Sequence, residues 1–341
     1  MLRLQCDITI GNLSFDYCEA VEVSSSWEQF TDTCKITMPT KFKDKNKNII
    51  SLDRLQAEKA VFKPGDKVTV KLGYVPQMWT VFEGYLKSAN PNTPLIFECE
   101  DASYLLKRRN IASFSQKGTT LSALINHIVG GIVPVKVLDA KIGDFRVSNE
   151  SFVNIVDVLD LVKSQFGFSA WFRGGELYVD YPSTRSTQTG ERPTHEFDFQ
   201  RNVVDSNLSY EVVEPDNIAV KGTSIKLNNT KIDRYAYYDT DGTIKVGSEA
   251  RKGEQRQFNF IELTQAELDE KIKGILPTVM YNGFSGSFNT FGFPFVQHGD
   301  KVKLIDRRYP ERDGTYLVRA VGTSFGTGGF RQSITLDTKV S

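Results

Sequence analysis

The residues whose types are best suited to catalysis are three carboxylates near residue 100. Glu98, Glu100 and Asp101 stand almost together, and glycoside hydrolases use two carboxylates that flank the scissile bond. Glu98 and Glu100 share one face if the segment is a strand, because side chains alternate between the two faces of a strand. Two carboxylates side by side on one strand do not flank a substrate, so we interpret these residues as solvated charges at a sheet edge.

Two further segments resemble ligand-binding loops only in part. Residues 239–242, Asp-Thr-Asp-Gly, begin like a calcium loop, but the twelfth position is Ala250 instead of a glutamate. Residues 322–329, GTSFGTGG, are rich in glycine, yet no Lys-Ser or Lys-Thr pair comes after them as in a phosphate-binding loop. We expect a hairpin turn in the first segment and a flexible strand connection in the second.

The histidines and cysteines lack the spacing of a catalytic or metal site. His127, His195 and His298 are far apart in the sequence, and no CxxC pair occurs. No serine or cysteine nucleophile has a histidine placed beside it. We therefore expect a chain that is not an enzyme, with no catalytic residues, no cofactor and no metal. We expect free, mostly buried thiols at the four cysteines, which are Cys6, Cys18, Cys34 and Cys99.

The composition describes a folded chain without an overall electrostatic preference. Of the 341 residues, 40% are hydrophobic, and the 42 Lys and Arg residues balance the 42 Asp and Glu residues. This balance argues against nonspecific binding to nucleic acid, although residues 107–109, Lys-Arg-Arg, offer a local basic patch as an alternative to a solvated loop. We also expect no specific nucleic-acid sequence as a partner. No stretch approaches the ~18 apolar residues of a membrane helix, so we expect no stable membrane insertion.

Residues 1–110 have the pattern of an antiparallel β module. Apolar and polar residues alternate over residues 4–10 and again over residues 68–72, as they do on strands with one buried face. The sequence Pro-Gly-Asp at 64–66 supplies a turn before the second of these strands, because proline fixes φ and glycine tolerates positive φ. We therefore place the first β module here.

Residues 111–182 change to the period of helices. Thr119 can cap one amphipathic helix that ends at a glycine pair, and Ser151 can cap a second that ends before Gly167. Each apolar stripe needs a sheet to cover, and the hairpin of residues 168–181, with its Gly-Gly turn, is suited to that role. This region is predicted to be a small α+β domain with two helices and a hairpin.

A polar segment separates this domain from a second β-rich region. Residues 182–193, PSTRSTQTGERP, contain almost no apolar side chain and indicate a linker. Strand patterns then resume, interrupted by one helix near 264–276 that we expect Pro277 to end. We place the second β module in residues 183–341, with a closing barrel segment near 285–341.

The most informative feature is a repeat that relates the two β-rich regions. The tetrapeptide Gly-Asp-Lys-Val occurs at 65–68 and again at 299–302. A Gly-Asp turn before a valine-rich strand is common by itself, so the match gains weight only if later segments correspond as well. We assign four structural turn residues to the repeated module, namely Gly65, Asp66, Gly299 and Asp300.

Two later segments correspond in the same order. Residues 82–86 match 314–318, and residues 95–99 match 332–336, each final strand then reaching an acidic residue, Asp101 or Asp337. Three ordered matches predict a duplicated module. Small β modules hide their edges by closing into barrels or by pairing with neighbours. We therefore expect a mainly β fold with an α+β insertion, built from two related antiparallel β-barrel modules.

The order of these motifs resembles the baseplate hub proteins of contractile-tailed phages. This family includes the late control and Mu-like tail proteins, and the hub part of type VI secretion spike proteins is similar. The middle of the chain also fits, where Gly-Phe-Ser-Ala-Trp-Phe precedes Gly-Gly-Glu-Leu-Tyr-Val. The motifs that carry the resemblance in the first module lie at residues 27–30, 36–39, 63–74, 82–86 and 97–101.

The resemblance implies a structural hub in the baseplate of a virion tail, assembled in the cytoplasm of the bacterial host. A homotrimer of a duplicated chain presents six similar modules, so it can join a sixfold tail tube to a threefold spike. The implied partners are the tail tube protein, the central spike protein and other baseplate proteins. We expect a separate spike protein, because no long β-helix and no lysozyme insertion is recognisable.

Two other functions are compatible with the residues. The scattered carboxylates and aromatic side chains are also typical of a carbohydrate-active or cell-wall-degrading enzyme. A sugar-binding module could use Trp79 or Trp171 as a stacking platform, although both tryptophans are better interpreted as core or interface residues.

Overall fold

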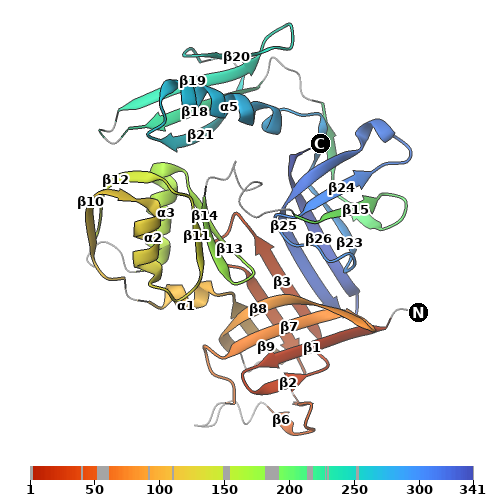
Figure 1. Cartoon of the computed structure of the whole chain (residues 1–341). Helices are drawn as coiled ribbons and strands as arrows, with labels where there is room; N and C mark the ends of the chain where they lie inside the picture. The colour runs from red at the N-terminus through yellow and green to blue at the C-terminus, as the bar shows by residue number, and fades with distance from the viewer. Residues whose placement is uncertain are drawn as a thin grey trace.

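The computed structural model describes most of the chain and is dominated by strands. Figure 1 shows one β-rich region at the bottom, a second at the upper right, and helix-bearing parts at the left and the top. The predicted fold class, mainly β with an α+β part, is confirmed. The described residues are 3–39, 41–51, 61–90, 93–109, 111–148, 154–180, 192–212, 218–226, 228, 230–250 and 253–340.

The first module is an antiparallel sheet with the strand order β3-β4-β9-β8-β7-β1-β2. Alternate residues of β1, namely Cys6, Ile8 and Ile10, are buried, as the period of two predicts. The strands are β1 (Leu4–Ile10), β2 (Leu13–Phe15), β3 (Ala20–Ser26), β4 (Thr33–Met38), β7 (Lys67–Tyr74), β8 (Gln77–Asn90) and β9 (Leu95–Glu100). A small hairpin, β5 (Lys41–Lys43) and β6 (Ile49–Ser51), precedes β7, and α1 (Ser103–Lys107) follows β9.

The second module repeats this arrangement. Its strands follow the order β16-β23-β26-β25, and β24 pairs with β25 on one side and with β15 on the other. They are β15 (Thr194–Asp198), β16 (Val203–Ser206), β23 (Ser287–Phe291), β24 (Lys301–Ile305), β25 (Gly314–Gly326) and β26 (Gly329–Lys339). Two short strands, β17 (Ser209–Glu211) and β22 (Gly283–Ser285), continue the ladder between β16 and β23, and a short 3-10 helix, η4 (Pro310–Arg312), precedes β25.

The two modules share one open sheet. β3 pairs with β25 over seven residue pairs, from Ala20 opposite Gly326 to Ser26 opposite Ala320. The resulting sheet contains 13 strands and, among the described residues, does not close on itself. The expectation of two closed barrels is therefore wrong in this respect. One edge of β3 pairs with β4 and the other with β25, so β3 has no free edge that could close the first module into a barrel.

The strand order supports an internal duplication. Read along the chain, β3, β4, β7, β8 and β9 have the same neighbours as β16, β23, β24, β25 and β26. One strand differs, because β1 pairs with β7 antiparallel whereas β15 pairs with β24 parallel. The repeat thus covers five strands of each module and does not extend to the sixth.

The two Gly-Asp turns make the same hydrogen bonds. In the first, Gly65 N donates to Leu86 O at 2.8 Å and Leu86 N donates to Asp66 O at 2.8 Å. In the second, Gly299 N donates to Val318 O at 2.7 Å and Val318 N donates to Asp300 O at 2.9 Å. Each aspartate also accepts from the amide three residues earlier, at 2.7 Å and 3.0 Å respectively.

A β-bulge and an ion pair are also repeated. The register of β8 against β9 shifts at Lys87, and that of β25 against β26 shifts at Arg319. Each of these basic residues pairs with a carboxylate near the end of the third strand, Glu100 at 2.8 Å and Asp337 at 3.4 Å. The counterpart of Asp337 is therefore Glu100. The sequence match with Asp101 was wrong by one position.

The helical middle contains the predicted helices and hairpin. Thr120 caps α2 through Ala123 N, one residue after the predicted Thr119, and Asn154 caps α3. The predicted cap Ser151 lies outside the described residues. The hairpin turn at Gly174 and Gly175 has φ of +59° and +79°, as a primed turn requires. The elements are β10 (Phe114–Thr120), α2 (Leu121–Val129), β11 (Val135–Val137), β12 (Lys141–Val147), α3 (Ile155–Phe166), β13 (Ser169–Arg173) and β14 (Glu176–Asp180).

A four-stranded sheet with one helix is inserted between β17 and β22. Its helix α5 (Gln265–Val279) begins with a capping box at Thr264 and Glu267. The helix includes Pro277, so the expectation that Pro277 ends it is wrong. A proline in the last turn removes only one backbone hydrogen bond. The strands are β18 (Ile218–Ile225), β19 (Lys231–Tyr238), β20 (Ile244–Gly247) and β21 (Glu254–Ile261).

This inserted sheet packs on the helical middle. Leu268 and Ile272 of α5 belong to the same buried cluster as Ile125 of α2 and Val158 of α3. Each β module has a buried cluster apart from this one, and the cluster of the first module also takes in Phe325 of β25 and Phe330 of β26. The boundaries at residues 110 and 182 stay predictions, and most of the polar segment 182–193 lies outside the described residues.

The repeated turns allow a matched test of backbone strain. Gly65→Ala should lower the free energy of unfolding by about 1–2 kcal/mol, because Gly65 has φ of +96°. Gly299→Ala should cost more, because a Cβ there would lie 2.6 Å from Arg192 Nη1 and 2.9 Å from Arg173 Nη1. Gly274→Ala, in the middle of α5 with open space around it, should instead stabilise the protein. Urea unfolding of the three variants checks this order, and an equal cost at the two turns would contradict it.

Candidate functional site

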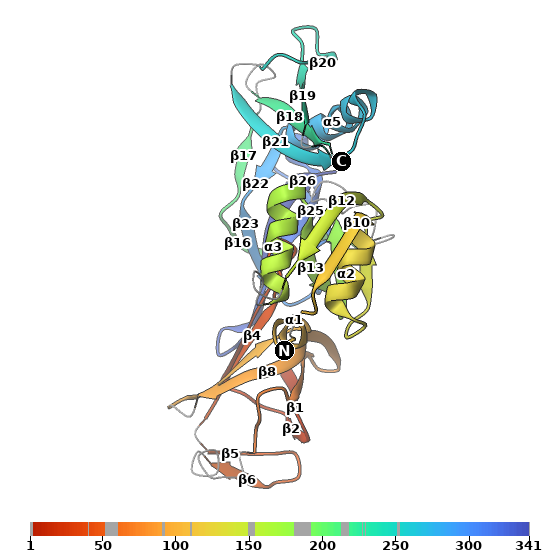
Figure 2. The ribbon, with the colours of Figure 1, turned by 90° about the vertical axis from the view of Figure 1, so that its left-hand side faces the viewer.

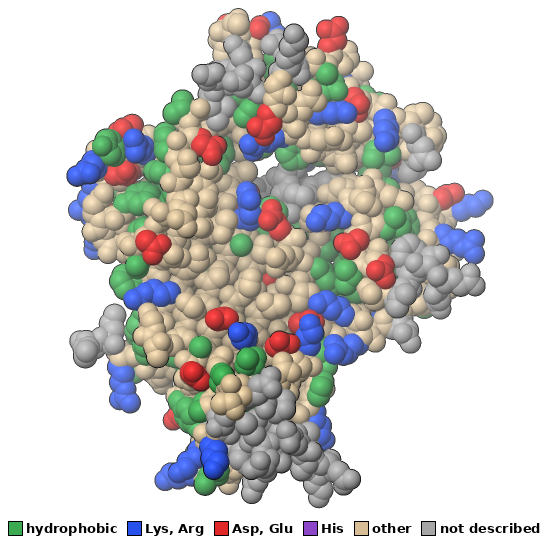
Figure 3. Space-filling view, turned by 180° about the vertical axis from the view of Figure 1, so that it is seen from behind, with side chains coloured by type: hydrophobic (Ala, Val, Ile, Leu, Met, Phe, Trp, Pro, Cys, Tyr) green, Lys and Arg blue, Asp and Glu red, His purple; other side chains and the backbone are tan. Residues whose placement is uncertain are grey.

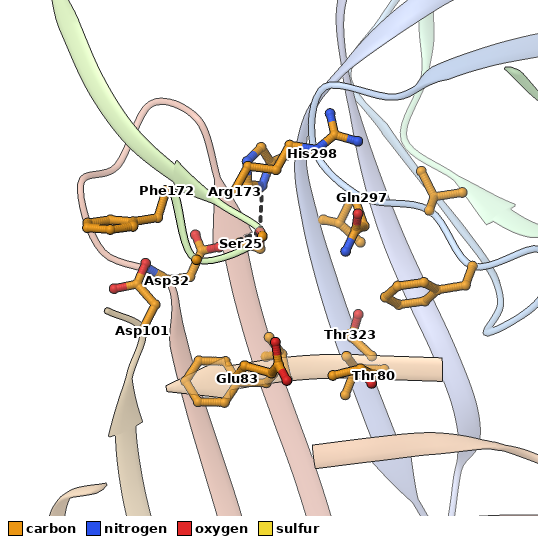
Figure 4. A pocket seen from close by; sticks show the side chains of 18 of the residues that line it. Ser25, Asp32, Thr80, Glu83, Asp101, Phe172, Arg173, Gln297, His298 and Thr323 are labelled. Atoms are coloured by element: carbon orange, nitrogen blue, oxygen red, sulfur yellow. Dashed lines mark hydrogen bonds between the residues drawn. The ribbon is translucent and has the colours of Figure 1, made fainter. Parts of the chain in front are cut away.

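Polar side chains gather where three parts of the chain meet. The strand β3 and the end of β9 come from the first module, the β13–β14 hairpin comes from the helical middle, and the turn before β24 comes from the second module. They surround a cavity of about 220 Å³, shown in Figure 4. We call this group the polar junction and define it by Ser25, Asp32, Asp101, Arg173, His298 and Asp300.

The centre of the polar junction is a serine between a histidine and a carboxylate. Ser25 Oγ lies 2.6 Å from His298 Nδ1 and donates to Asp32 Oδ2 at 2.7 Å. Because the serine hydroxyl has one hydrogen, His298 Nδ1 must donate to Ser25 Oγ when the hydroxyl donates to Asp32. His298 is 3% exposed, and burial together with the charge of Arg173 lowers its pKa to about 3. The imidazole is therefore neutral near pH 7.

This arrangement differs from a catalytic triad. In a triad the histidine accepts the serine proton, and the carboxylate holds the other ring nitrogen. Here the carboxylate of Asp32 accepts from Ser25 itself, and while it does so the ring nitrogen next to Ser25 can only donate to the hydroxyl. The chain of hydrogen bonds links β3 to the turn before β24.

Two aspartates in the polar junction lie close together. Asp32 N donates to Asp101 Oδ2 at 3.0 Å, and Ser103 N donates to Asp101 Oδ1 at 2.9 Å. Burial, together with the charge of Asp101, raises the pKa of Asp32 to about 7, and burial raises the pKa of Asp101 to about 6. One of the two can therefore hold a proton at neutral pH.

Asp300 connects the second module to the helical middle. Its carboxylate accepts from Arg173 Nη2 at 2.7 Å and lies 3.3 Å from His195 Nε2. The Asp300 side chain is 4% exposed. Burial disfavours its charge, but the hydrogen bonds of His195 and Gln297 and the charge of Arg173 outweigh burial and lower the pKa of Asp300. A charged Asp300 thus holds β13 and β15 against the turn.

The carboxylates first considered for glycosidase chemistry lie in three separate environments. Glu98 accepts from Ser88 Oγ at the surface, whereas Glu100 is buried between Lys87 and Lys107 at 2.8 Å and 3.0 Å. Asp101 belongs to the polar junction. These contacts engage the three carboxylates with their own neighbours, so they do not flank a common cleft.

The basic triplet is likewise engaged within the chain. Besides the pair of Lys107 with Glu100, the Arg108 guanidinium lies 3.6 Å from the centre of the Tyr104 ring, and Arg109 donates to the Val129 carbonyl. On the face shown in Figure 3, acidic and basic side chains are interspersed. Neither observation favours an electrostatic site for nucleic acid.

The remaining sequence candidates have structural surroundings. Trp171 is 2% exposed and stacks on Tyr178, and Trp79 is half-buried against Phe293 at 5.6 Å between ring centres. The segment 239–242 forms the turn between β19 and β20. All four cysteines are free, and no group of three His, Cys, Asp or Glu residues in the described parts of the chain is placed to hold a metal. None of the described helices has the length and hydrophobicity to cross a bilayer.

Sequence reasoning missed the polar junction. Ser25 and Asp32 carried no motif, and His298 stands 273 positions from Ser25. Asp300 was identified only as a turn residue, and the structure adds its contact with Arg173. The proximity of Asp300 to a repeated glycine was the one available signal, and it did not distinguish the second turn from the first.

The fold is similar to that of solved tail proteins. The prophage MuSo2 43 kDa tail protein from Shewanella oneidensis has a TM-score of 0.57 and 15% identity, covering 98% of this chain and 97% of that chain. The tail protein from Neisseria meningitidis MC58 has a TM-score of 0.59 and 14% identity, covering 99% and 96%. At these identities the likeness establishes the fold.

A third similar structure comes from a secretion system. The E. coli c3393 protein, a component of the type VI secretion system with structural similarity to the T4 bacteriophage tail proteins gp27 and gp5, has a TM-score of 0.54 and 10% identity. The match covers 97% of this chain and 76% of that one. No family model matches the sequence, and no curated protein matches it.

The equivalent aspartates of the two turns provide a matched pair of variants. Asp300→Ala should lower the free energy of unfolding by about 3 kcal/mol, because it leaves Arg173 without its buried partner. Asp66→Ala removes the acceptor for Lys63 N at an exposed turn and should cost about 1 kcal/mol. Thermal and urea unfolding measure both values. Equal losses would contradict the role assigned to Asp300 in the polar junction.

Asp32 should make stability depend on pH. Its pKa of about 7 in the folded chain exceeds the ordinary value, so the folded state retains a proton that the unfolded state releases. The free energy of unfolding should therefore fall as pH rises from about 4 to about 7. Asp32→Asn removes this titration and should be more stable than the wild type by about 3–4 kcal/mol at pH 8, with little difference at pH 4.

The control for this experiment is Asp32→Ala. Alanine also abolishes the titration but leaves Ser25 Oγ and Ser26 N without their acceptor, so it should be destabilising at pH 4. Urea unfolding at pH 4, 6 and 8 distinguishes the two effects. A gap between the Asn variant and the wild type that does not change with pH would refute the assignment.

Proposed function

We propose that this chain is a structural subunit of the baseplate in a phage or phage-like contractile tail. The observation that carries the proposal is the duplicated module. Its two copies share the Gly-Asp turn, the β-bulge and the ion pair, and the pairing of β3 with β25 joins them edge to edge. The likeness to prophage tail proteins over nearly the whole chain supports the same function.

The duplicated module suits a hub that matches two symmetries. Three copies of a chain with two similar modules present six similar units around an axis while the whole remains threefold. Such a homotrimer joins a sixfold tail tube protein to a threefold central spike protein, with other baseplate proteins around it. The chain would then reside in the baseplate of the virion tail.

The polar junction fits a structural function better than an enzymatic one. Ser25, Asp32 and His298 are linked by hydrogen bonds, as are Arg173 and Asp300. The neutral His298 is 3% exposed between the modules, although His298 Nε2 and Arg173 Nη1 are buried without a hydrogen-bond partner among the described residues. A subunit under mechanical load needs a fixed angle between its modules. Buried hydrogen bonds that are satisfied in only one arrangement favour such a fixed angle.

The proposal predicts a threefold assembly. Native mass spectrometry of the purified chain should show a trimer, or a monomer that becomes a trimer when the spike protein is added. Averaged electron micrographs viewed along the axis should show a ring with six similar lobes. A tight dimer under both conditions would contradict the proposal, and so would peptidoglycan hydrolysis that a single carboxylate substitution abolishes.

A further inference from the structure

The joint between the modules gives a template for a second joint. β25 is long because it has two successive partners on one edge, first β24 up to the pair Leu317 and Lys301, and then β3 from Ala320 onward. The bulge at Arg319 lies between these two parts. The second part of β25 is thus the surface to which the neighbouring module attaches.

The first module has the same surface without a described partner. β8 pairs with β7 up to the pair Tyr85 and Lys67, and Leu86 then bonds the Gly-Asp turn. Beyond the bulge at Lys87, residues 88–90 pair with β9 on one edge. Their other edge has no partner among the described residues. Ser88 and Ala320 each follow the bulge residue of their module directly, so these two residues are at equivalent positions.

The second module has a matching edge that is also unpartnered among the described residues. In the first module Val21 of β3 lies opposite Ile36 of β4, and in the second Ser206 lies opposite Phe288 of β23. Val21 and Ser206 are therefore at equivalent positions in the two modules. β17 continues the register of β16 against β22, so further along the strand Glu211 is equivalent to Ser26. Figure 2 shows β16 and β17 along one margin of the molecule, with the far end of β8 reaching the same margin below them.

We propose that β17 of one copy pairs antiparallel with residues 88–90 of β8 in the next copy, which repeats between chains the joint that β3 and β25 make within one chain. The inference rests on the proposed homo-oligomeric hub and names its contact surface. The register is taken from the template, with Ser88 opposite Glu211, Ala89 opposite Tyr210 and Asn90 opposite Ser209.

The side chains on these edges suit contact with a second copy. Ser209 and Glu211 are exposed while Tyr210 points to its own core beside Phe284, so β17 keeps its inner face packed while its edge is open. Val212, at the end of β17, is 71% exposed. An open strand edge of this kind is a template for pairing with another chain.

The proposed joint is heterologous, because different surfaces of the two copies meet. Such contacts produce rings when the rotation closes. The joint is also shorter than its template among the described residues, where the β8–β9 pairing reaches Asn90 and the β25–β26 pairing reaches Gly326. Three residues per ladder make a weaker contact than seven, so the copies should separate on dilution before the modules do.

Cysteine crosslinking tests the register. Facing residues of an antiparallel pair have Cα atoms about 4.5–5.5 Å apart, within the range that a disulfide spans. Ser88→Cys with Glu211→Cys should crosslink copies of the chain into covalent oligomers on mild oxidation. The control is Ser88→Cys with Asp205→Cys, whose partner position lies six residues away, or about 20 Å along the strand. The crosslinked fraction should be at least tenfold higher for the facing pair.

A second pair protects the test against a folding defect. Glu211 accepts a hydrogen bond from Ser285, so its substitution can disturb β17, and Asn90→Cys with Ser209→Cys tests the same register elsewhere. Mixing the two single variants, Ser88→Cys and Glu211→Cys, should give covalent dimers only. The wild type, with its four native cysteines, should not crosslink.

Each outcome separates this inference from the proposed function. A trimer in native mass spectrometry without disulfides at either facing pair would overturn the strand contact and leave the hub proposal intact. Equal crosslinking of the facing pair and the control would also overturn the strand contact, because such a result indicates random collision between copies. A chain that stays monomeric with and without the spike protein, and does not crosslink, would contradict both.

Discussion

The structure depends on the ladder between β3 and β25. Seven residue pairs join segments that are about 300 positions apart in the chain, and they turn two small modules into one sheet. The ladder satisfies backbone groups on two strand edges at once, which would otherwise need water or another chain. It also fixes how the modules lie relative to each other, because antiparallel pairing sets both the direction and the register of the strands.

The polar junction is a consequence of this ladder. Pairing of β3 with β25 brings Ser25 beside the turn that carries His298, and the hairpin of the helical middle covers the space between them with Arg173. Buried polar groups are costly unless each finds a partner. A small rotation of one module against the other would separate Ser25 from His298 and Arg173 from Asp300. The junction therefore selects one relative orientation of the modules.

The two copies of the module show how one local structure acquires two roles. Gly65 is exposed, and its turn closes a strand pair at the surface, whereas Gly299 is buried and its turn carries Asp300 into the polar junction. The same divergence appears at the hairpins, because β25 holds β3 over seven residue pairs while the described part of β8 beyond the bulge ends at Asn90. The duplication supplied equivalent geometry, and the surroundings decided which copy binds within the chain.

The sequence by itself determined the local elements, namely the strand periods, the glycine turns, the capping box at Thr264 and the repeat that begins at Gly65 and Gly299. Its errors in these elements were small, such as the cap at Thr120 instead of Thr119 and the helix that continues through Pro277. Only the tertiary structure decided that the modules form an open sheet and that Ser25 meets His298. Alternation of apolar residues records which face of a strand is buried, and it carries no information about which strand lies at its edge.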